Sequence, residues 1–241
     1  MMGGGRWSES HILVLPRHKL IYVAIPKAAS TRIRKILARA EGRFSRSLRA
    51  DKRSRYRGPY GPRNKTIGSV YRVATDSAAL RFSFVRNPYA RAVSCRADKF
   101  AGKPLVGGDP FIDAYPAARR NIDARLPSGA HACLSFAEFV AFVAGAAEAH
   151  NDSHIQSQSN ILDIPGMQFD FIGRVESFGA DFARVLDHLK VSDDERREAA
   201  TLVNESHHDS WQNYYTRHLA DCIYRAYEQD FDQFRYARCW L

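Results

Sequence analysis

The 241-residue sequence predicts an α/β protein in which helices flank a central, mostly parallel β-sheet. Apolar runs with the length and residue types of buried strands lie at 20–25, 80–85 and 169–175. Segments with apolar residues at helical spacing follow them, at 31–40, 89–100 and 178–189. Strands that alternate with helices are typical of a parallel sheet with helices on both faces. We expect a single domain over residues 1–241, with 1–17 as an N-terminal extension.

Capping residues mark where several of these helices begin. Ser30 or Thr31 can cap the first helix, and Asn87 can cap the second, with Pro88 at its first helical position. A capping box, Ser135 with Glu138, opens a further helix that we expect to end near residue 147. The last two helices are expected over 193–203 and 219–231.

The remaining segments predict loops, and one of them is strongly basic. They lie at 42–67, 102–130 and 150–165 and lack a regular apolar period. The net charge is +10, and the segment 32–63 holds twelve Lys or Arg residues against two Asp or Glu residues. Such a charge attracts polyanions, so nucleic acid, an anionic glycan and a small phosphorylated cofactor are all compatible with it. A solvated loop with incidental charge is the alternative.

Composition also bears on where the protein works. The four cysteines have no CxxC spacing, so they predict neither a metal cage nor a disulfide framework, and their sparseness fits a reducing cytosol. The first ten residues lack the apolar run of a signal peptide. No apolar run approaches the roughly 20 residues that span a bilayer. We therefore expect a soluble, cytoplasmic protein, at most peripheral to a membrane.

The segment 26–31, Pro-Lys-Ala-Ala-Ser-Thr, connects the first strand to its helix and predicts a phosphate site. A tight turn into a helix leaves several N–H groups without partners, and the helix dipole favours an anion there. Ala28, Ala29 and Ser30 are small enough for a phosphate to approach the backbone. Lys27 can neutralise its oxygens, and Ser30 and Thr31 add hydroxyl donors.

The order of residues in this segment separates it from a Walker loop. A Walker loop has its lysine directly before the helix, together with glycines and a hydroxyl that holds magnesium. Here the lysine comes first and glycine is absent, which disfavours a Walker-type NTPase. The alternative is an ordinary strand-to-helix turn with a surface lysine.

A second candidate phosphate site follows the strand at 80–85. Arg86 stands at its carboxyl end, where open α/β sheets bind ligands, and Ser94 lies about two turns into the next helix. An arginine fork and a hydroxyl can hold a phosphate from two directions. Alternatively, Arg86 pairs with a carboxylate and Ser94 faces solvent.

Together these segments resemble the carbohydrate sulfotransferases, in the branch called sulfotransferase family 2. That family has a PKxxST loop and an RDPxxRxxSxxxxKF stretch, which correspond here to 26–31 and to 86–94 with Lys99 and Phe100. Phe-Asp-Phe-Ile-Gly-Arg-Val-Glu at 169–176 is similar to the family's YDFIGKVE strand. Further likenesses lie at 204–206, 214–216 and 223–236, so the resemblance covers about residues 18–236. It implies a P-loop-like fold of three layers in one domain.

The resemblance also implies the reaction. The donor would be 3′-phosphoadenosine-5′-phosphosulfate (PAPS), and a sulfuryl group would pass in line to a hydroxyl of a carbohydrate or glycolipid acceptor, for which an anionic saccharide is our first choice. Lys27 would be catalytic and would bind the 5′-phosphosulfate together with the residues that follow it: Ala28, Ala29, Ser30, Thr31 and Arg32. Arg86 and Ser94 would bind the 3′-phosphate. We expect no metal and no nucleic-acid partner.

Two departures from the family pattern matter. Asn87 replaces an aspartate but can still cap a helix. The family's cysteine-rich HWxPxxxLCxPC stretch corresponds here to 154–162, which has no cysteine. That difference favours a cytosolic, bacterial-type enzyme over a secretory-pathway enzyme.

The general base is a separate question. His154 aligns with the histidine of that stretch and is the first candidate, with Asp152 as a residue that could orient it. Weaker candidates are His207, His208 and Glu176. The competing functions are another nucleotide-dependent transferase, such as a small-molecule kinase, and a nucleic-acid-binding protein built on the basic segment. The first would need a magnesium carboxylate and the second a recognition motif, and neither is visible in the sequence.

Overall fold

The computed structural model describes residues 11–40, 76–100, 134–145, 153–194, 196–197 and 210–239. The chain divides into two compact units. The sheet unit comprises 7–85 and 162–205, and the helical unit comprises 1–6, 86–161 and 206–241. The expected loops at 42–67 and 102–130 lie outside the described residues. The expectation of one domain stays a prediction.

Among the described residues, the sheet unit has four strands in the order of the chain: β1 (Ile12–Leu15), β2 (Leu20–Val23), β3 (Leu80–Val85) and β4 (Phe171–Arg174). β1 is antiparallel to β2, whereas β2, β3 and β4 run parallel. The predicted α/β class and mostly parallel sheet are therefore confirmed. β1 is a correction, since its residues were assigned to an N-terminal extension. The Ile-Leu-Val-Leu run has a strand's composition, but its short length hid it.

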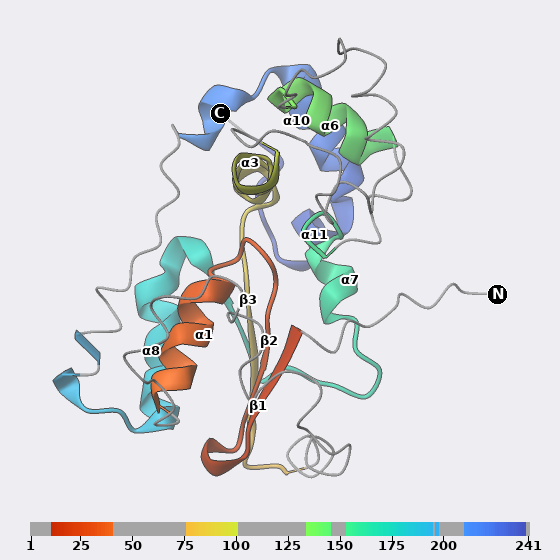
Figure 1. Ribbon diagram of the computed structural model, residues 1–241. Coiled ribbons are helices and arrows are strands. Elements are labelled where there is room, and N and C mark those ends of the chain that lie inside the picture. The colour runs from red at the N-terminus through yellow and green to blue at the C-terminus, as the bar shows by residue number, and fades with distance from the viewer. Residues whose placement is uncertain are drawn as a thin grey trace, which may run out of the picture. The chain divides into compact units, whose positions relative to one another are not determined.

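Alternation along the strands separates the two faces of this sheet. Leu20, Tyr22, Phe82 and Phe84 join one apolar cluster, while Ile21 joins another. α1 (Ser30–Ala40) and α8 (Phe178–Leu189) cover the face on which the first cluster lies (Figure 1). Their apolar stripes, Ile33, Ile36 and Leu37 on α1 and Phe178, Phe182, Val185, Leu186 and Leu189 on α8, are buried as the helical spacing predicts.

Two residues explain the sequence Asp-Phe-Ile-Gly at 170–173, where the chain enters β4. The Asp170 carboxylate accepts hydrogen bonds from the Arg81 backbone N–H (2.8 Å) and from its guanidinium (3.3 Å), which joins the starts of β3 and β4. Gly173 lies so close to Phe84 that a Cβ would come within 2.6 Å of its ring. Any larger residue at 173 would have to displace the aromatic core of the sheet unit.

The helical unit contains α3 (Pro88–Lys99), α6 (Phe136–Gly145), α7 (Gln158–Leu162, with its last residue in the sheet unit), α10 (Arg217–Ala226) and α11 (Glu228–Gln233). Two predicted caps are confirmed. The Asn87 side-chain oxygen accepts from Tyr89 N–H (2.9 Å) and Ala90 N–H (3.5 Å). The Ser135 N–H donates to the Glu138 carboxylate (2.9 Å), and the Glu138 N–H donates back to the Ser135 hydroxyl (3.2 Å).

Two expectations for the helical unit need correction. The segment expected to be irregular, 150–165, contains α7, and Ile155 and Gln158 are fully buried. The single helix expected over 219–231 is instead α10 and α11, separated at Tyr227. The buried Tyr227 phenol donates to the Ile155 carbonyl (2.6 Å), a tertiary contact that apolar spacing does not reveal.

No helix among the described residues is both long and apolar enough to cross a membrane.

Candidate functional site

The turn between β2 and α1 has an unusual backbone. Lys27 and Ala29 adopt left-handed conformations, with φ of 68° and 57°. This region costs a residue with a Cβ roughly 1–2 kcal/mol and persists only where the surroundings enforce it. Ala28 between them is fully buried, and its N–H donates to the Ile25 carbonyl (3.2 Å). The predicted phosphate loop is thus held in a strained, tightly packed turn.

The turn leads into an α1 N-terminus that can receive an anion. The first bond of the helical ladder runs from the Ile33 N–H to the Ala29 carbonyl (3.0 Å), so the N–H groups of the preceding residues lie at the N-terminal end of the helix, where the helix dipole is positive. The first turn contains no acidic residue that would compete for the helix dipole. Small residues, N–H groups and a neighbouring lysine together fit a phosphate.

The guanidinium of Arg32 packs against an aromatic ring. Its guanidinium lies over the Phe178 ring, 4.1 Å from the centroid, and burial lowers its pKa. This cation–π contact within the sheet unit uses the side chain to pack α1 against α8. The expected role of Arg32 in donor binding stays a prediction.

Arg86, the first residue after β3, is held by its backbone. The Gln158 amide oxygen accepts from the Arg86 N–H (2.9 Å), and the Gln158 amide nitrogen donates to the Arg86 carbonyl (2.8 Å). Gln158 is fully buried. Both backbone hydrogen-bonding groups of Arg86 are thereby satisfied by one side chain, between the end of β3 and the Asn87 cap of α3.

Ser94 lies on the buried side of α3. Only 3% of the residue is exposed, in a helix whose residues from Pro88 to Cys95 are all buried. The alternative in which Ser94 faces solvent is therefore wrong. A role in binding a phosphate stays a prediction for both Arg86 and Ser94.

Arg91 holds the segment that carries His154. It is 2% exposed, and its guanidinium donates to the carbonyls of Gln156 (2.8 Å) and Ser153 (2.9 Å). These two bonds bracket His154, which is half-buried. The arginine is part of the RxxS pattern at 91–94, so the sequence contained a signal for it, but its partners were not visible there.

Of the other candidates for the general base, the structure describes only Glu176. Glu176 is exposed. Asp152, His207 and His208 lie outside the described residues, as does the 204–206 segment. In the part of the chain that the structure describes, no group of three or more His, Cys, Asp or Glu side chains could hold a metal ion.

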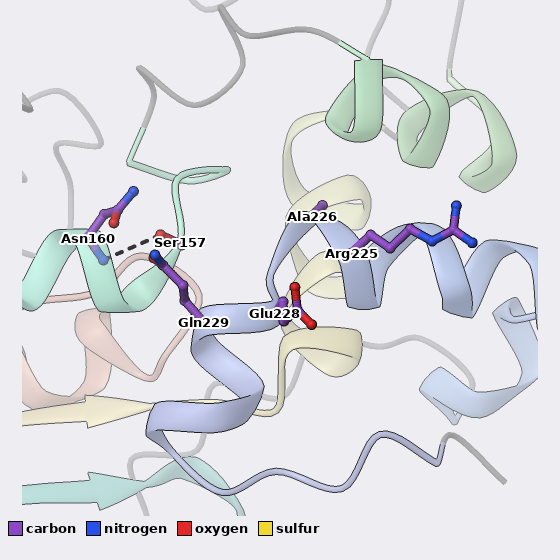
Figure 2. Close-up of a pocket in the computed structure, with 6 residues that line it drawn as sticks. All are labelled: Ser157, Asn160, Arg225, Ala226, Glu228 and Gln229. Carbon is purple, nitrogen blue, oxygen red and sulfur yellow. Dashed lines mark hydrogen bonds between the residues drawn. The ribbon is translucent and has the colours of Figure 1, made fainter. Parts of the chain in front are cut away.

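A pocket of about 260 Å³ opens in the helical unit between α7 and the α10–α11 junction (Figure 2). Its lining is polar apart from one alanine: Ser157, Asn160, Arg225, Ala226, Glu228 and Gln229. Side chains of this kind can hydrogen-bond sugar hydroxyls, but the pocket contains no aromatic face on which a sugar ring could stack.

Comparison with known proteins bears on the whole chain. Residues 10–237 match the model of the "Sulfotransferase family". Carbohydrate sulfotransferase 8 of Mus musculus is 28% identical over 183 residues, 71% of this chain and 42% of the relative. Carbohydrate sulfotransferase 14 of Mus musculus is 27% identical over 195 residues, 79% of this chain and 49% of the relative. The chain thus spans less than half the length of these curated relatives. No solved structure matches it significantly.

These relatives correct one expectation. A cytoplasmic protein of bacterial type was inferred from the sparse cysteines and the missing cysteine-rich stretch. That inference is wrong, because the matching curated proteins are carbohydrate sulfotransferases of mouse and human. The lack of cysteines in one stretch of the chain is therefore poor evidence of compartment or organism.

Proposed function

The chain belongs to the sulfotransferase family, and from that premise we propose that it transfers a sulfuryl group from PAPS to a hydroxyl of a carbohydrate-containing acceptor. The observation that carries the proposal is the 26–31 turn, where two non-glycine residues hold left-handed backbones ahead of a helix N-terminus without acidic residues. A strained backbone at a loop that accommodates an anion is typical of a functional site.

The 5′-phosphosulfate end of the donor is assigned to this turn. The N–H groups of Ser30, Thr31 and Arg32 would bind its oxygens, with the Ser30 and Thr31 hydroxyls as further donors. Ala28 and Ala29 leave room for the anion beside the backbone. Lys27 would neutralise the oxygen that bridges phosphorus and sulfur.

The 3′-phosphate is assigned to Arg86 and Ser94, on the evidence of the 86–94 motif. The backbone of Arg86 is held on both sides, which supports a fixed direction for its guanidinium. A bound 3′-phosphate would distinguish this donor from ATP, which has none. This distinction gives the assignment a direct test.

The proposed transfer breaks the bond between sulfur and the bridging oxygen and forms a bond between sulfur and the acceptor oxygen. The acceptor's proton passes to a base, and adenosine 3′,5′-bisphosphate leaves with the electron pair of the broken bond. Charge grows on the leaving oxygen as the bond lengthens, so a cation there lowers the barrier. Lys27 supplies that cation, and the proposed mechanism includes no metal.

We assign the base to His154. The two hydrogen bonds from Arg91 fix the backbone on either side of it, which supports a defined orientation for the imidazole. An imidazole nitrogen can accept the proton of an attacking hydroxyl, which is the task of a general base. Replacement by Gln would keep a polar side chain but remove the proton acceptor, so kcat should fall while donor affinity stays constant.

The acceptor is assigned to carbohydrates because the curated relatives are named carbohydrate sulfotransferases. An anionic saccharide suits the net charge of +10 and the basic 32–63 segment. The test is a screen of neutral and anionic glycans with ³⁵S-labelled PAPS, on the wild-type chain and on Lys27→Ala. The proposal is supported if a glycan becomes labelled with the wild-type chain and not with Lys27→Ala. Label transfer that Lys27→Ala leaves intact would contradict the role of the turn.

A further inference from the structure

A network of hydrogen bonds around two buried polar side chains, Gln158 and Asp230, joins three parts of the helical unit that are distant in the sequence. Asp230, on α11, is fully buried. Its carboxylate accepts from the N–H groups of Gln158 (2.9 Å) and Ser159 (2.8 Å) and from the Ser159 hydroxyl (2.8 Å). These three bonds fix the first residues of α7.

Gln158 extends this network to Arg86. Its backbone is held by Asp230, while its side-chain amide pairs with both the N–H and the carbonyl of Arg86. The three residues lie at positions 86, 158 and 230, and each link between them is made by a side chain bonded to backbone. An apolar residue of the same size at 158 would fill the space but leave two polar backbone groups of Arg86 without these partners.

The geometry points to Gln158 and Asp230 as positioning residues for the 3′-phosphate site. Gln158 sets the backbone conformation of Arg86, and Asp230 sets the position of Gln158. Neither is assigned a contact with the donor. The inference rests on the proposed function, because it presumes that the Arg86 guanidinium binds the 3′-phosphate.

A positioning role predicts a specific defect. If the Arg86 backbone loses its restraint, the guanidinium samples more directions and pays more entropy to bind the phosphate. Affinity for adenosine 3′,5′-bisphosphate then falls, whereas affinity for adenosine 5′-monophosphate, which lacks the 3′-phosphate, does not. Merely weakened folding would lower both affinities alike. The ratio of the two dissociation constants therefore separates the two roles.

The experiment is calorimetric titration of both nucleotides into the full 241-residue chain. We expect Gln158→Leu to reduce the preference for the bisphosphate by about tenfold, as for the loss of charge-assisted contacts. Gln158→Glu keeps an acceptor for the Arg86 N–H but removes the donor to its carbonyl, so it should lie between wild type and Gln158→Leu. Asp230→Asn and Ser159→Ala weaken the next link and should give smaller changes in the same direction.

Tyr227→Phe is the matched control. It removes a buried hydrogen bond of the same unit, from the Tyr227 phenol to the Ile155 carbonyl (2.6 Å), without touching Arg86. It should lower the melting temperature but leave the nucleotide preference unchanged. Amide hydrogen exchange at Arg86 gives a second readout, which should accelerate in Gln158→Leu and not in Tyr227→Phe.

The outcomes are distinguishable. If wild type shows no preference for the bisphosphate, the proposed donor is wrong and the positioning role falls with it, before any variant is made. If wild type prefers the bisphosphate and Gln158→Leu and Gln158→Glu keep that preference, the positioning role is wrong and the proposed function stands. A Gln158→Leu chain that fails to fold leaves Gln158→Glu and Ser159→Ala to decide.

Discussion

The sheet unit and the helical unit hold their candidate site residues by different means. In the sheet unit, the 26–31 turn follows a strand paired on both sides and packs on an apolar core of Tyr22, Phe82 and Phe84. In the helical unit, Arg86 and the His154 segment are held by buried polar side chains bonded to backbone: Arg91, Gln158 and Asp230. An apolar core tolerates conservative substitutions. Removing one partner of a buried hydrogen bond is more destabilising, because the other partner is left without a hydrogen bond.

The largest expected effect is on Lys27, in the sheet unit. Lys27→Ala should lower kcat by about 10²–10³-fold, the usual cost of removing a group that stabilises a leaving or attacking oxygen. Lys35→Ala, which removes a lysine from α1 after the turn, should leave kcat unchanged. Steady-state kinetics with labelled donor measure both. Equal kcat values for the two variants would remove Lys27 from the mechanism.

The next effect is on the stability of the helical unit. Arg91→Met should lower the free energy of unfolding by about 3 kcal/mol, since the carbonyls of Ser153 and Gln156 both lose a buried charged donor. Arg96→Met, on the same helix, removes one bond to the Leu134 carbonyl (2.8 Å) from a half-buried residue and should cost about 1 kcal/mol. Urea unfolding of both variants measures the difference. Similar costs would mean that the helical unit does not depend on its buried polar network.

Arg86→Ala separates binding from stability. Affinity for adenosine 3′,5′-bisphosphate should fall by more than about tenfold, because a charge-assisted contact is lost. Arg225→Ala removes an exposed arginine of the same unit and is the control. Calorimetric titration decides the point. Unchanged affinity in Arg86→Ala would contradict the assignment of the 3′-phosphate.

A smaller effect tests the backbone of the 26–31 turn. Ala29 has a φ of 57°, where a β-branched side chain clashes, so Ala29→Val should cost about 1–2 kcal/mol. Ala29→Gly should fold normally and keep donor binding. Ala38→Val, within α1, should cost less than about 1 kcal/mol. If Ala29→Val matched Ala38→Val in urea unfolding, the turn would not be strained.

The smallest effect concerns alkaline pH. Burial, followed by the Asp221 carboxylate, raises the pKa of Tyr89 from 10.0 to about 12. The unfolded chain releases this proton at lower pH than the folded protein does. The stabilisation is therefore fully present below pH 10 and is lost as pH rises towards 12. Urea unfolding from pH 8 to 11.5 should show this fall, and Tyr89→Phe should reduce its slope. A slope that Tyr89→Phe leaves unchanged would assign the fall to other groups.

The same contrast explains what the sequence could predict. In the sheet unit, apolar runs and helical spacing located β2, β3, β4, α1 and α8, because burial on a regular element imposes a period on the sequence. β1 was not predicted, because a strand of four residues is too short to show a period of apolar residues. Capping residues were equally readable, since Asn87 and the Ser135–Glu138 pair act within a few residues of chain.

The helical unit exposes the limit of that approach. Gln158 and Asp230 are 72 residues apart and meet only in the folded protein. Nothing in the local sequence around Gln158 distinguishes a buried amide from a solvated one, so the 150–165 segment looked irregular. The break between α10 and α11 at Tyr227 was also missed, because the apolar spacing continues across it, and the bond from the Tyr227 phenol to the Ile155 carbonyl joins residues 72 positions apart. Sites built from long-range polar contacts need the structure.

The most direct test of the central claim is which nucleotide the protein recognises. Thermal unfolding of the wild-type chain should be measured with adenosine 3′,5′-bisphosphate and, separately, with ATP and magnesium. We predict that the bisphosphate raises the melting temperature in a concentration-dependent way and that ATP with magnesium does so much less, because ATP lacks the 3′-phosphate. Stabilisation by ATP with magnesium and not by the bisphosphate would contradict the account.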